Sequence, residues 1–386
     1  MPRKHCLNAV IAAAVTLYSV IACQDARTQT LIPIPIGGVK INDKGDVCGL
    51  YGESAALWYN DGTNTFVRFL NSTAVATDIN NNDVVCGLGQ GSDLGVFTAY
   101  NLRASPHSLA VIGGASGAAT TSGPYVGWLI GGGNYLGPSP TAAINNNGDV
   151  AFAACPATGH PPQGAGPLHA LVWALPGPPV ASPLPPGLPN PVPPVLYWDL
   201  NSPFYTTTAY DINDAREVCG VGNPNHTDYS YPCYWSSLTS GPTILGLYPG
   251  TRLQNGVAVA LDNGSNPAIV GFYPGGPSGQ QHACAWYPSS PSVTIDLNPP
   301  GATSSVAEDV ARNAVTGEDV AVGYAIISGQ QHGIVWVISP SGAFTYTDLY
   351  NFVPGATISN AKAVSQTGIY LVSANFTLGG SDCILE

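Results

Sequence analysis

The sequence predicts an all-β protein, a β-propeller of seven blades, with eight blades as the alternative. The chain of 386 residues contains 46 glycines and 35 prolines, and both residue types are unfavourable in helices. Only 9% of the residues are charged, against about 25% in average proteins, which argues against long charged helices. The chain also repeats a unit of four short apolar segments, and four strands in roughly 40–50 residues make a propeller blade.

The first element of the repeat is an apolar residue, an Asn- or Asp-rich turn, and a short β-prone segment such as Val-Cys-Gly. Asn and Gly favour a tight connection between two strands. The segment after the turn is apolar on both faces, as expected of a strand between two neighbouring sheets. Four clear copies and three looser copies begin at Ile41, Ile79, Ile144, Ile212, Leu261, Val310 and Val364.

The second element is a small apolar run that ends in an aromatic residue, and it predicts the third strand. Its shared position predicts that the tryptophans pack between blades. These tryptophans are Trp58, Trp173, Trp235, Trp286 and Trp336. An Asp-Leu pair, as in Asp296-Leu297, then predicts the fourth strand.

The two ends of the chain predict how the ring closes. The last unit finishes after its third strand, and residues 31–38 lie where a fourth strand belongs. An N-terminal strand is therefore expected to complete the last blade. Pro33 and Pro35 fit an outer edge strand, where no ladder donor is lost.

This pattern of Ala-x-x-Ile-Asn, Gly-x-Val-x-Gly, His-Ala-x-x-Trp and x-Asp-Leu resembles the HAF-repeat family of bacterial extracellular proteins. The resemblance covers most of residues 31–386 and implies a secreted, propeller-like protein. The family has no established catalytic residues that could be assigned to positions of this sequence. The sequence departs from the family pattern where Val-Cys-Gly replaces Val-Val-Gly, and the last three units are degenerate.

The N-terminus predicts export. A short basic region and an uncharged apolar stretch make residues 1–22 a signal peptide. Val-Ile-Ala-Cys resembles a lipobox, which predicts lipidation of Cys23, whereas ordinary cleavage after Ala22 is the alternative. Residues 23–30 would then be a short linker, and residues 31–386 a single propeller domain, in an outer-membrane, cell-surface, periplasmic or extracellular protein.

The charge balance limits the partners. The formal net charge is −12, with 11 Lys and Arg residues in all, so the chain lacks a basic patch for nucleic acid. Contact with a membrane is expected only through the lipid anchor. The expected partner is an extracellular ligand, a glycan or a protein, bound by a monomer.

Two irregular segments interrupt the repeat. Residues 176–194 contain ten prolines and are expected to form an exposed extended loop. Residues 109–137 echo part of a unit, as a truncated eighth blade or an elaborated hairpin. Tyr125, Trp128 and Tyr135 in this second segment are the candidates for an exposed ligand patch.

The Asn- and Asp-rich turns have two interpretations. Asn42, Asp43 and Asp46 resemble part of a calcium loop. The full calcium-loop pattern is absent, and turns favour the same residues for conformational reasons. The turn interpretation is preferred, and no cofactor is predicted.

The cysteines occupy repeated positions. Most are expected to be free thiols that replace small buried hydrophobic residues. Cys219 and Cys233 lie on adjacent strands of one unit and are the candidate disulfide.

The predicted function is a non-enzymatic binding scaffold, with its ligand at the mouth of the central channel or on inserted loops. One alternative is a glycan hydrolase or lyase, for which carboxylates must converge at one channel mouth. The residues to inspect for such a cluster are Asp46, Asp149, Asp211 and Asp309. A purely structural envelope protein is the other alternative.

Overall fold

The computed structural model describes residues 30–52, 54–61, 74–89, 95–100, 108–114, 125–126, 142–156, 169–174, 196–200, 204–224, 229–246, 255–275, 280–376 and 379–386. These residues form 28 strands and no helix. Accordingly, no described segment is a helix that could cross a membrane. The predicted signal peptide 1–22, Cys23 and the proline-rich segment 176–194 lie outside the described residues.

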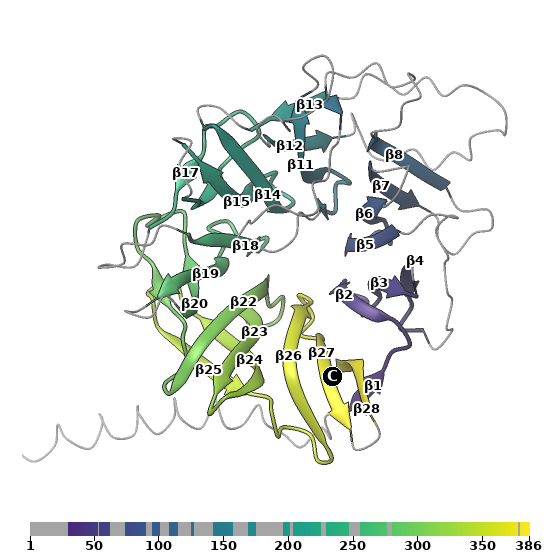
Figure 1. The fold of residues 1–386 in the computed structure, drawn as a ribbon, viewed down its shortest axis with the longest axis vertical. Helices are drawn as coiled ribbons and strands as arrows, with labels where there is room; N and C mark the ends of the chain where they lie inside the picture. The colour runs from purple at the N-terminus through teal and green to yellow at the C-terminus, as the bar shows by residue number, and fades with distance from the viewer. Residues whose placement is uncertain are drawn as a thin grey trace, which may run out of the picture.

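The strands form seven small antiparallel sheets, which follow one another around a central axis (Figure 1). The all-β class and the seven-bladed propeller are therefore confirmed. We number the blades in chain order. Blade 1 contains β2 (Gly37–Ile41), β3 (Val47–Tyr51) and β4 (Ser54–Trp58). Blade 2 contains β5 (Ala74–Ile79), β6 (Val85–Gly89), β7 (Gly95–Tyr100) and β8 (Ser108–Gly114).

The next three blades have the same antiparallel order. Blade 3 contains β10 (Ala143–Ile144), β11 (Val150–Pro156), β12 (His169–Ala174) and β13 (Leu196–Asp199), with β9 (Tyr125–Val126) paired to β11. Blade 4 contains β14 (Thr206–Ile212), β15 (Val218–Asn223), β16 (Tyr231–Trp235) and β17 (Thr243–Ile244). Blade 5 contains β18 (Val257–Leu261), β19 (Ile269–Gly275), β20 (Gln280–Trp286) and β21 (Ile295–Asp296).

The last two blades contain the longest strands, of up to 11 residues. Blade 6 contains β22 (Ala302–Arg312), β23 (Asp319–Ile327), β24 (Gln330–Ile338) and β25 (Phe344–Asp348). Blade 7 contains β26 (Ala356–Val364), β27 (Tyr370–Phe376), β28 (Gly379–Leu385) and, from the other end of the chain, β1 (Leu31–Pro33).

The ring closes with an N-terminal strand, as the sequence predicts, but this strand is shorter than residues 31–38, because Gly37 and Gly38 already belong to β2 of blade 1. Strand β1 pairs antiparallel with β28, so that Leu31 lies opposite Leu385 and Pro33 lies opposite Cys383. Because β1 is an edge strand, the missing N–H of Pro33 interrupts no inner ladder. The first and last segments of the domain thus share one sheet.

The eighth-blade alternative is wrong. Ser108–Gly114 is β8, the outer strand of blade 2, and it pairs with β7. Tyr125–Val126 pairs with β11 and so extends blade 3. The echo of a repeat in this segment therefore comes from strands that belong to two complete blades.

The core lies between neighbouring blades. The cluster between blades 1 and 2, for example, joins Leu57 of β4 to Val85 of β6. The recurrent glycine of the second strand has a local cause, shown by Gly220 and Gly271. A Cβ added there would lie 2.0 or 1.9 Å from a backbone oxygen of the first strand, opposite a β-bulge. The Val-x-Gly pattern therefore reflects close backbone approach within each blade.

Candidate functional site

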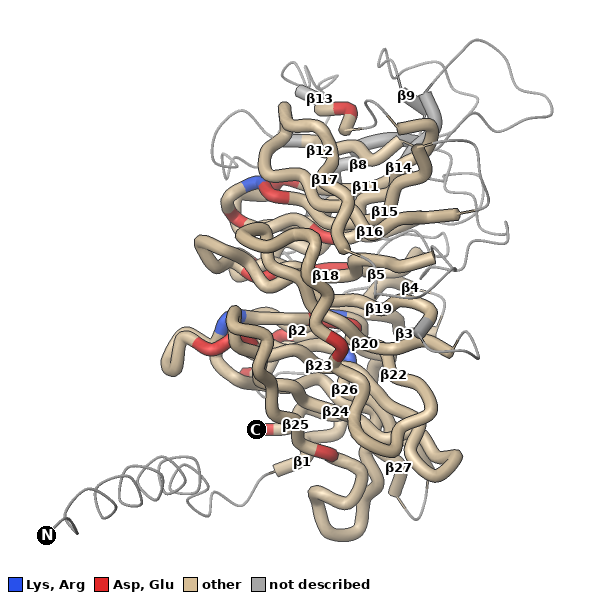
Figure 2. The backbone as a smooth tube through the Cα atoms, turned by 90° about the vertical axis from the view of Figure 1, so that its left-hand side faces the viewer, with Lys and Arg blue, Asp and Glu red and all other residues tan. Residues whose placement is uncertain are grey.

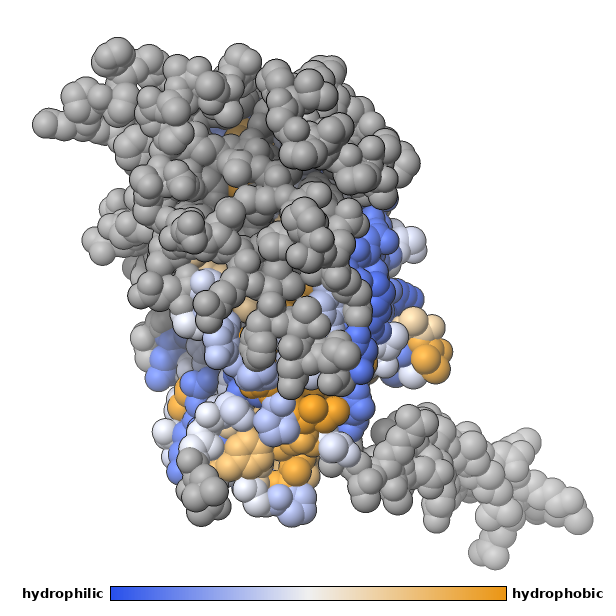
Figure 3. Space-filling model, turned by 90° about the vertical axis from the view of Figure 1, so that its right-hand side faces the viewer, coloured by the Kyte–Doolittle hydropathy of each residue, from blue (hydrophilic) through white to orange (hydrophobic). Residues whose placement is uncertain are grey.

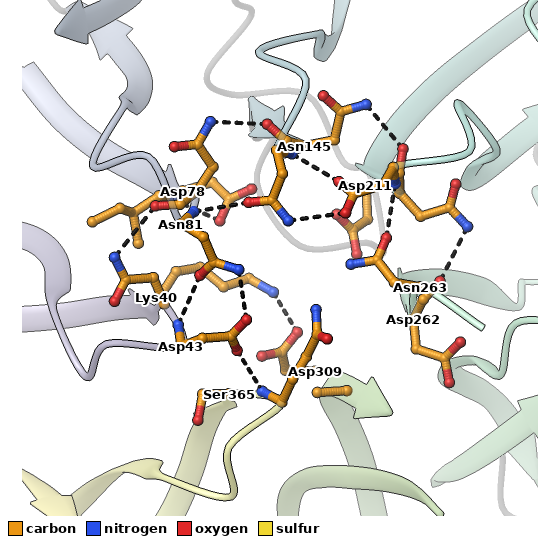
Figure 4. Close-up of a pocket in the computed structure, with 18 of the residues that line it drawn as sticks. Lys40, Asp43, Asp78, Asn81, Asn145, Asp211, Asp262, Asn263, Asp309 and Ser365 are labelled. Atoms are coloured by element: carbon orange, nitrogen blue, oxygen red, sulfur yellow. Dashed lines mark hydrogen bonds and ion pairs between the residues drawn. The ribbon is translucent and has the colours of Figure 1, made fainter. Parts of the chain in front are cut away.

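The turns between the first and second strands of all seven blades meet at one end of the central axis. Residues from every blade line a cavity of about 120 Å³ there, and their side chains converge from different strands (Figure 4). We call this region the channel mouth. Many of the charged residues lie toward one side of the molecule (Figure 2), and a hydrophilic band runs along one side in the space-filling view (Figure 3).

One repeat position supplies the charged groups inside the mouth. This channel position directly precedes the Ile, Leu or Val with which each copy of the repeat begins, and it follows a β-bulge in six blades. A bulge redirects the side chains beside it. In chain order the position holds Lys40, Asp78, Ala143, Asp211, Ala260, Asp309 and Ala363.

The three aspartates at the channel position link neighbouring blades. Asp78 accepts the N–H of Ile79 in its own blade and the N–H of Ile144 in blade 3, both at 2.8 Å. Asp211 bonds in the same way to Ile212, at 2.8 Å, and to Leu261 of blade 5, at 3.0 Å. These carboxylates are therefore held in place by backbone donors from two blades.

Asp309 and Lys40 form the ion pair of the mouth. One oxygen of Asp309 accepts the N–H of Val364 in blade 7, at 3.0 Å, and the other accepts Lys40 Nζ. The pair joins blade 6 to blade 1 across the axis. Burial opposes the charge on Lys40, but the attraction of Asp309, Asp211 and Asp78 outweighs it and raises the lysine pKa.

The other two channel carboxylates have raised pKa values. Burial, opposed by the charge of Lys40, raises the pKa of Asp78 to about 7. The same two causes, in the same order, place the pKa of Asp211 at about 6. Two groups at the mouth can therefore exchange protons near neutral pH.

A ring of asparagines surrounds the mouth at the first turn position, which directly follows the first strand. The Oδ1 of Asn80 accepts the N–H groups of Asn82 and Val84 in its own turn. Its Nδ2 donates to the carbonyl of Asn145 in the next blade, at 2.9 Å. Equivalent donor bonds run from Asn42 to Asn80, from Asn145 to Asn213 and from Asn213 to Asp262.

A second series of bonds uses the next residue of each turn, the second turn position. In five of the seven blades, the N–H of this residue is donated to the side chain of its counterpart in the following blade. The pairs are Asp43 to Asn81, Asn81 to Asn146, Asn146 to Asp214, Asp214 to Asn263, and Gln366 to Asp43. The Asn- and Asp-rich turns therefore connect blades as well as strands.

The calcium interpretation finds little support in this geometry. Both oxygens of Asp43 accept protein donors, from Gln366 and Asn81, and Asn42 Oδ1 accepts two N–H groups of its own turn. Asp46 accepts the N–H of Asn60. Within the described residues, no group of three or more His, Cys, Asp or Glu side chains is arranged to hold a metal ion.

Of the four carboxylates proposed for an enzyme, two reach the channel and two do not. Asp211 and Asp309 line the mouth. Asp46 and Asp149 are buried at the start of second strands, and Asp149 forms an ion pair with Arg216 at 2.9 Å. Sequence reasoning missed Lys40 and Asp78, although an alignment of the residues before each repeat's Ile would have placed them with Asp211 and Asp309.

A histidine of the third strand has the same type of partner in three blades. His169, His282 and His332 each bond through Nδ1 to the aspartate of the fourth strand in the same blade, at 2.7 to 3.2 Å. The tryptophans pack between blades as predicted. Trp235, Trp286 and Trp336 are fully buried, and each indole N–H donates to a carbonyl of the preceding blade.

The Cys219–Cys233 disulfide is not formed, and both thiols are free and buried. Cys233 lies opposite Gly220, while Cys219 lies opposite Tyr234. Neighbouring residues of a strand point to opposite faces, so the two sulfur atoms enter different cores, one toward blade 5 and one toward blade 3. Burial raises the pKa of both thiols.

The predicted ligand patch is largely outside the described residues. Trp128 and Tyr135 are not among them, and Tyr125 is described only as a backbone position in β9. The channel mouth is therefore the candidate site that the described residues form.

No family model and no curated protein matches this sequence. The chain is similar in structure to TolB from Acinetobacter baumannii, at 12% identity and a TM-score of 0.44 over 90% of this chain and 70% of that one. It is similar to a chain of a mitotic checkpoint complex, at 10% identity and a TM-score of 0.49 over 92% of both chains. A polysaccharide lyase of family PL25, an ulvan lyase, gives 10% identity and a TM-score of 0.40 over 92% of this chain and 84% of that one. These similarities concern the β-propeller fold alone.

Proposed function

We propose that the protein is a secreted or surface-anchored β-propeller that binds an extracellular ligand at the channel mouth without transforming it. The observation that supports a binding role is the double anchoring of Asp78 and Asp211 by backbone N–H groups of two blades. Carboxylates held in this way make the polar lining of the channel mouth rigid. A preformed site binds its ligand with little loss of conformational entropy.

The ligand is proposed to be a glycan or a protein segment rich in hydrogen-bonding groups. The channel mouth offers the amide and carboxylate groups of Asn81, Asn146, Asp214 and Asn263 around one cavity. A small number of precisely placed polar groups gives such a site its specificity. Membership of the HAF-repeat family, a monomeric state, export through residues 1–22 and anchoring at Cys23 belong to the same proposal.

A glycan array followed by thermal-shift titration, with and without Ca²⁺ and a chelator, tests the binding role. A ligand of the channel mouth is expected to bind Gln366→Arg more weakly than the wild type, because the substitution adds a positive charge to the lining. The hydrogen bonds of Gln366 described above use its backbone, so the substitution leaves them in place. The ligand should bind normally to Tyr346→Arg, a change on the outer strand β25. Equal binding to both variants would mean that the ligand binds outside the channel mouth. A melting temperature raised by Ca²⁺ would support the calcium interpretation of the turns.

A second candidate function is hydrolysis or elimination on an extracellular glycan. It is favoured by the pKa of Asp78 at about 7 and of Asp211 at about 6, because a general acid needs a pKa near the working pH. Incubation of any bound glycan with the protein, followed by mass analysis, separates the two functions. Recovery of the intact glycan supports the scaffold. Cleavage that Asp78→Asn abolishes while the ligand still binds would establish the enzyme.

The localisation is tested by fractionation. Cys23→Ser is expected to release the protein from membranes into the soluble fraction, because the substitution removes the lipidated side chain. An unchanged distribution would contradict the lipid anchor.

A further inference from the structure

The accessible surface of the channel mouth is polar. The aliphatic residues that line its cavity, such as Ile41, Ile212 and Val364, are each at most 7% exposed, and the other lining residues are polar or charged. Apolar side chains of a peptide would cover little apolar surface here. The hydroxyl groups of a saccharide, in contrast, meet amide and carboxylate groups to which they can bond. The mouth therefore fits a glycan better than a peptide.

The lining of the cavity is also strongly acidic. It contains six aspartates and two cations, Lys40 and Arg312. Lys40 pairs with the lining residue Asp309, whereas Arg312 pairs with Asp319, which lies outside the lining. Among the described residues, no Lys, Arg or His side chain forms an ion pair with the other five aspartates, Asp43, Asp78, Asp211, Asp214 and Asp262. The protein's own cations therefore leave most of these carboxylates uncompensated.

Asp78 and Asp211 can each accept further donors. Each of their four oxygens accepts one backbone N–H group, and an ionised carboxylate offers about four acceptor positions in all. The backbone bonds fix both carboxylates at the mouth without neutralising them. Burial raises the pKa of each, so a cation beside them would stabilise the ionised form.

Asp262 supplies an independent indication of a ligand. The residue lines the same cavity and is 2% exposed. Its Oδ1 accepts the N–H of Gly264 at 2.7 Å, whereas its Oδ2 is buried and accepts no hydrogen bond from the described residues. A buried acceptor without a donor is costly. A donor or a cation supplied by a ligand on this side of the mouth would remove that cost.

Lys40 shows that the centre of the mouth accepts a primary ammonium group. Its Nζ donates to Asp309 Oδ1 (Figure 4). At the channel position, blades 2 to 7 alternate between aspartate and alanine, and blade 1, the odd blade of the seven, holds Lys40. Asp78 and Asp211 thus occupy the position that Asp309 has in its own blade, but no ammonium group of the described residues forms an ion pair with them.

We propose that the channel mouth recognises a glycan that carries free amino groups, with ligand ammonium groups at Asp78 and Asp211 and sugar hydroxyl groups at the surrounding asparagines. The proposal rests on the binding function above and names the class of its ligand, a saccharide of de-N-acetylated amino sugars. A neutral saccharide lacks the ion pairs, and an acidic saccharide is repelled by the unpaired aspartates.

Two oligosaccharides that differ only in their amino groups test the class of ligand. Chains of glucosamine and of N-acetylglucosamine, matched in length, are titrated into the protein by calorimetry at about pH 6.5. The glucosamine chain is expected to bind at least about tenfold more tightly, because its ammonium groups form charge-assisted hydrogen bonds. The difference should shrink at high salt, which screens charges at an open site.

Substitutions of the two proposed contacts separate this site from general attraction. Asp78→Asn and Asp211→Asn should each weaken binding of the glucosamine chain about tenfold and leave the affinity for the N-acetylated chain unchanged. Glu318→Gln is the matched control, because it removes the same charge from an exposed residue of the blade 6 turn outside the cavity lining. It should change neither affinity. Circular dichroism checks that each variant is folded.

Lys40→Met should change the affinity in the opposite direction. The substitution removes the protein's own ammonium group and frees Asp309 for the ligand, so the glucosamine chain is expected to bind about threefold to tenfold more tightly. A gain in affinity cannot come from an unfolded mouth, so this variant keeps the test decisive if the aspartate variants are unstable. Unchanged or weaker binding by folded Lys40→Met would count against the proposal.

The outcomes distinguish this proposal from the binding function on which it rests. Equal binding of the two oligosaccharides would overturn recognition of the amino group and leave glycan binding intact. Equal losses in Glu318→Gln and Asp211→Asn would also overturn it, because they would show attraction by net charge alone. If neither oligosaccharide binds but another glycan does, the ligand class is wrong. If no glycan binds at all, the proposed glycan-binding function fails as well.

Discussion

At the scale of single residues, the side-chain amide of asparagine explains the composition of the turns. Asn80 needs an acceptor for its own turn and a donor for the next blade, and an amide supplies both. The sequence predicts the turn, because Asn suits it conformationally. The bond to the next blade is not predictable from one unit, because the acceptor belongs to a residue 65 positions away.

Asn80→Asp tests this dual role. The carboxylate keeps the acceptor and loses the donor to Asn145, which leaves a buried carbonyl without its partner. We expect a loss of about 1–2 kcal/mol in the free energy of unfolding, measured by urea denaturation. Asn266→Asp is the matched control, because Asn266 is used as an acceptor, and it should change stability by less than about 0.5 kcal/mol. Equal effects of the two substitutions would contradict the role of the donor.

The ion pair of the mouth permits a second residue-scale prediction. Asp309→Asn leaves Lys40 without its nearest counter-charge. Removal of one partner from a fully buried pair costs roughly 3–5 kcal/mol. The Lys40 side chain is 24% exposed, so we expect a smaller loss, about 2 kcal/mol. The double variant Lys40→Met/Asp309→Asn should recover part of it in urea denaturation, and strict additivity of the two single changes would argue against coupling.

At the scale of the elements, the third strands of blades 4, 5 and 6 each carry a tryptophan whose indole N–H bonds to the preceding blade. The indole N–H of Trp336 in β24 donates to the carbonyl of Leu297 at 2.8 Å, and the ring is fully buried. The repeated position of the tryptophans predicts their packing. It does not predict the hydrogen bond, because that bond depends on how the previous blade ends.

Trp336→Phe separates the two contributions of the ring. Phenylalanine fills much of the space but offers no donor, so the carbonyl of Leu297 loses its partner. We expect a loss of about 2 kcal/mol from the unsatisfied carbonyl and the reduced volume together. Tyr346→Phe on the exposed strand β25 is the control, with a change within about 0.5 kcal/mol. A melting temperature unchanged in Trp336→Phe would show that packing alone holds the joint.

At the scale of the whole molecule, the ring is closed by β1 and centred on a cluster of carboxylates. Closure places Leu31–Pro33 and Cys383–Leu385 side by side in one blade, so every blade has two neighbours. It also brings Lys40 of blade 1 to Asp309 of blade 6. The central charges therefore exist as a group only in the closed ring.

The stability of the whole protein should depend on pH for this reason. The pKa values of Asp78 and Asp211 are raised from the unfolded value of 3.8 to about 7 and about 6. The folded protein then binds more protons than the unfolded chain between about pH 4 and pH 7, so its stability falls as the pH rises through this window. We expect a lower melting temperature at pH 8 than at pH 5, and a smaller difference in Asp78→Asn/Asp211→Asn. A melting temperature that rises across this window would contradict the raised pKa values.

The sequence by itself determined the all-β class, the seven repeats, the order of strands and the closure of the ring by an N-terminal strand, although that strand spans only Leu31–Pro33 of the expected residues 31–38. These features follow from local patterns, namely turn residues, apolar segments and a position missing from the last unit. Only the tertiary structure decided which residues form the mouth. Lys40 and Asp78 join Asp211 and Asp309, while Cys219 and Cys233 turn to opposite faces. Such contacts join residues of different blades or depend on strand register, and the pattern within a single unit does not contain that information.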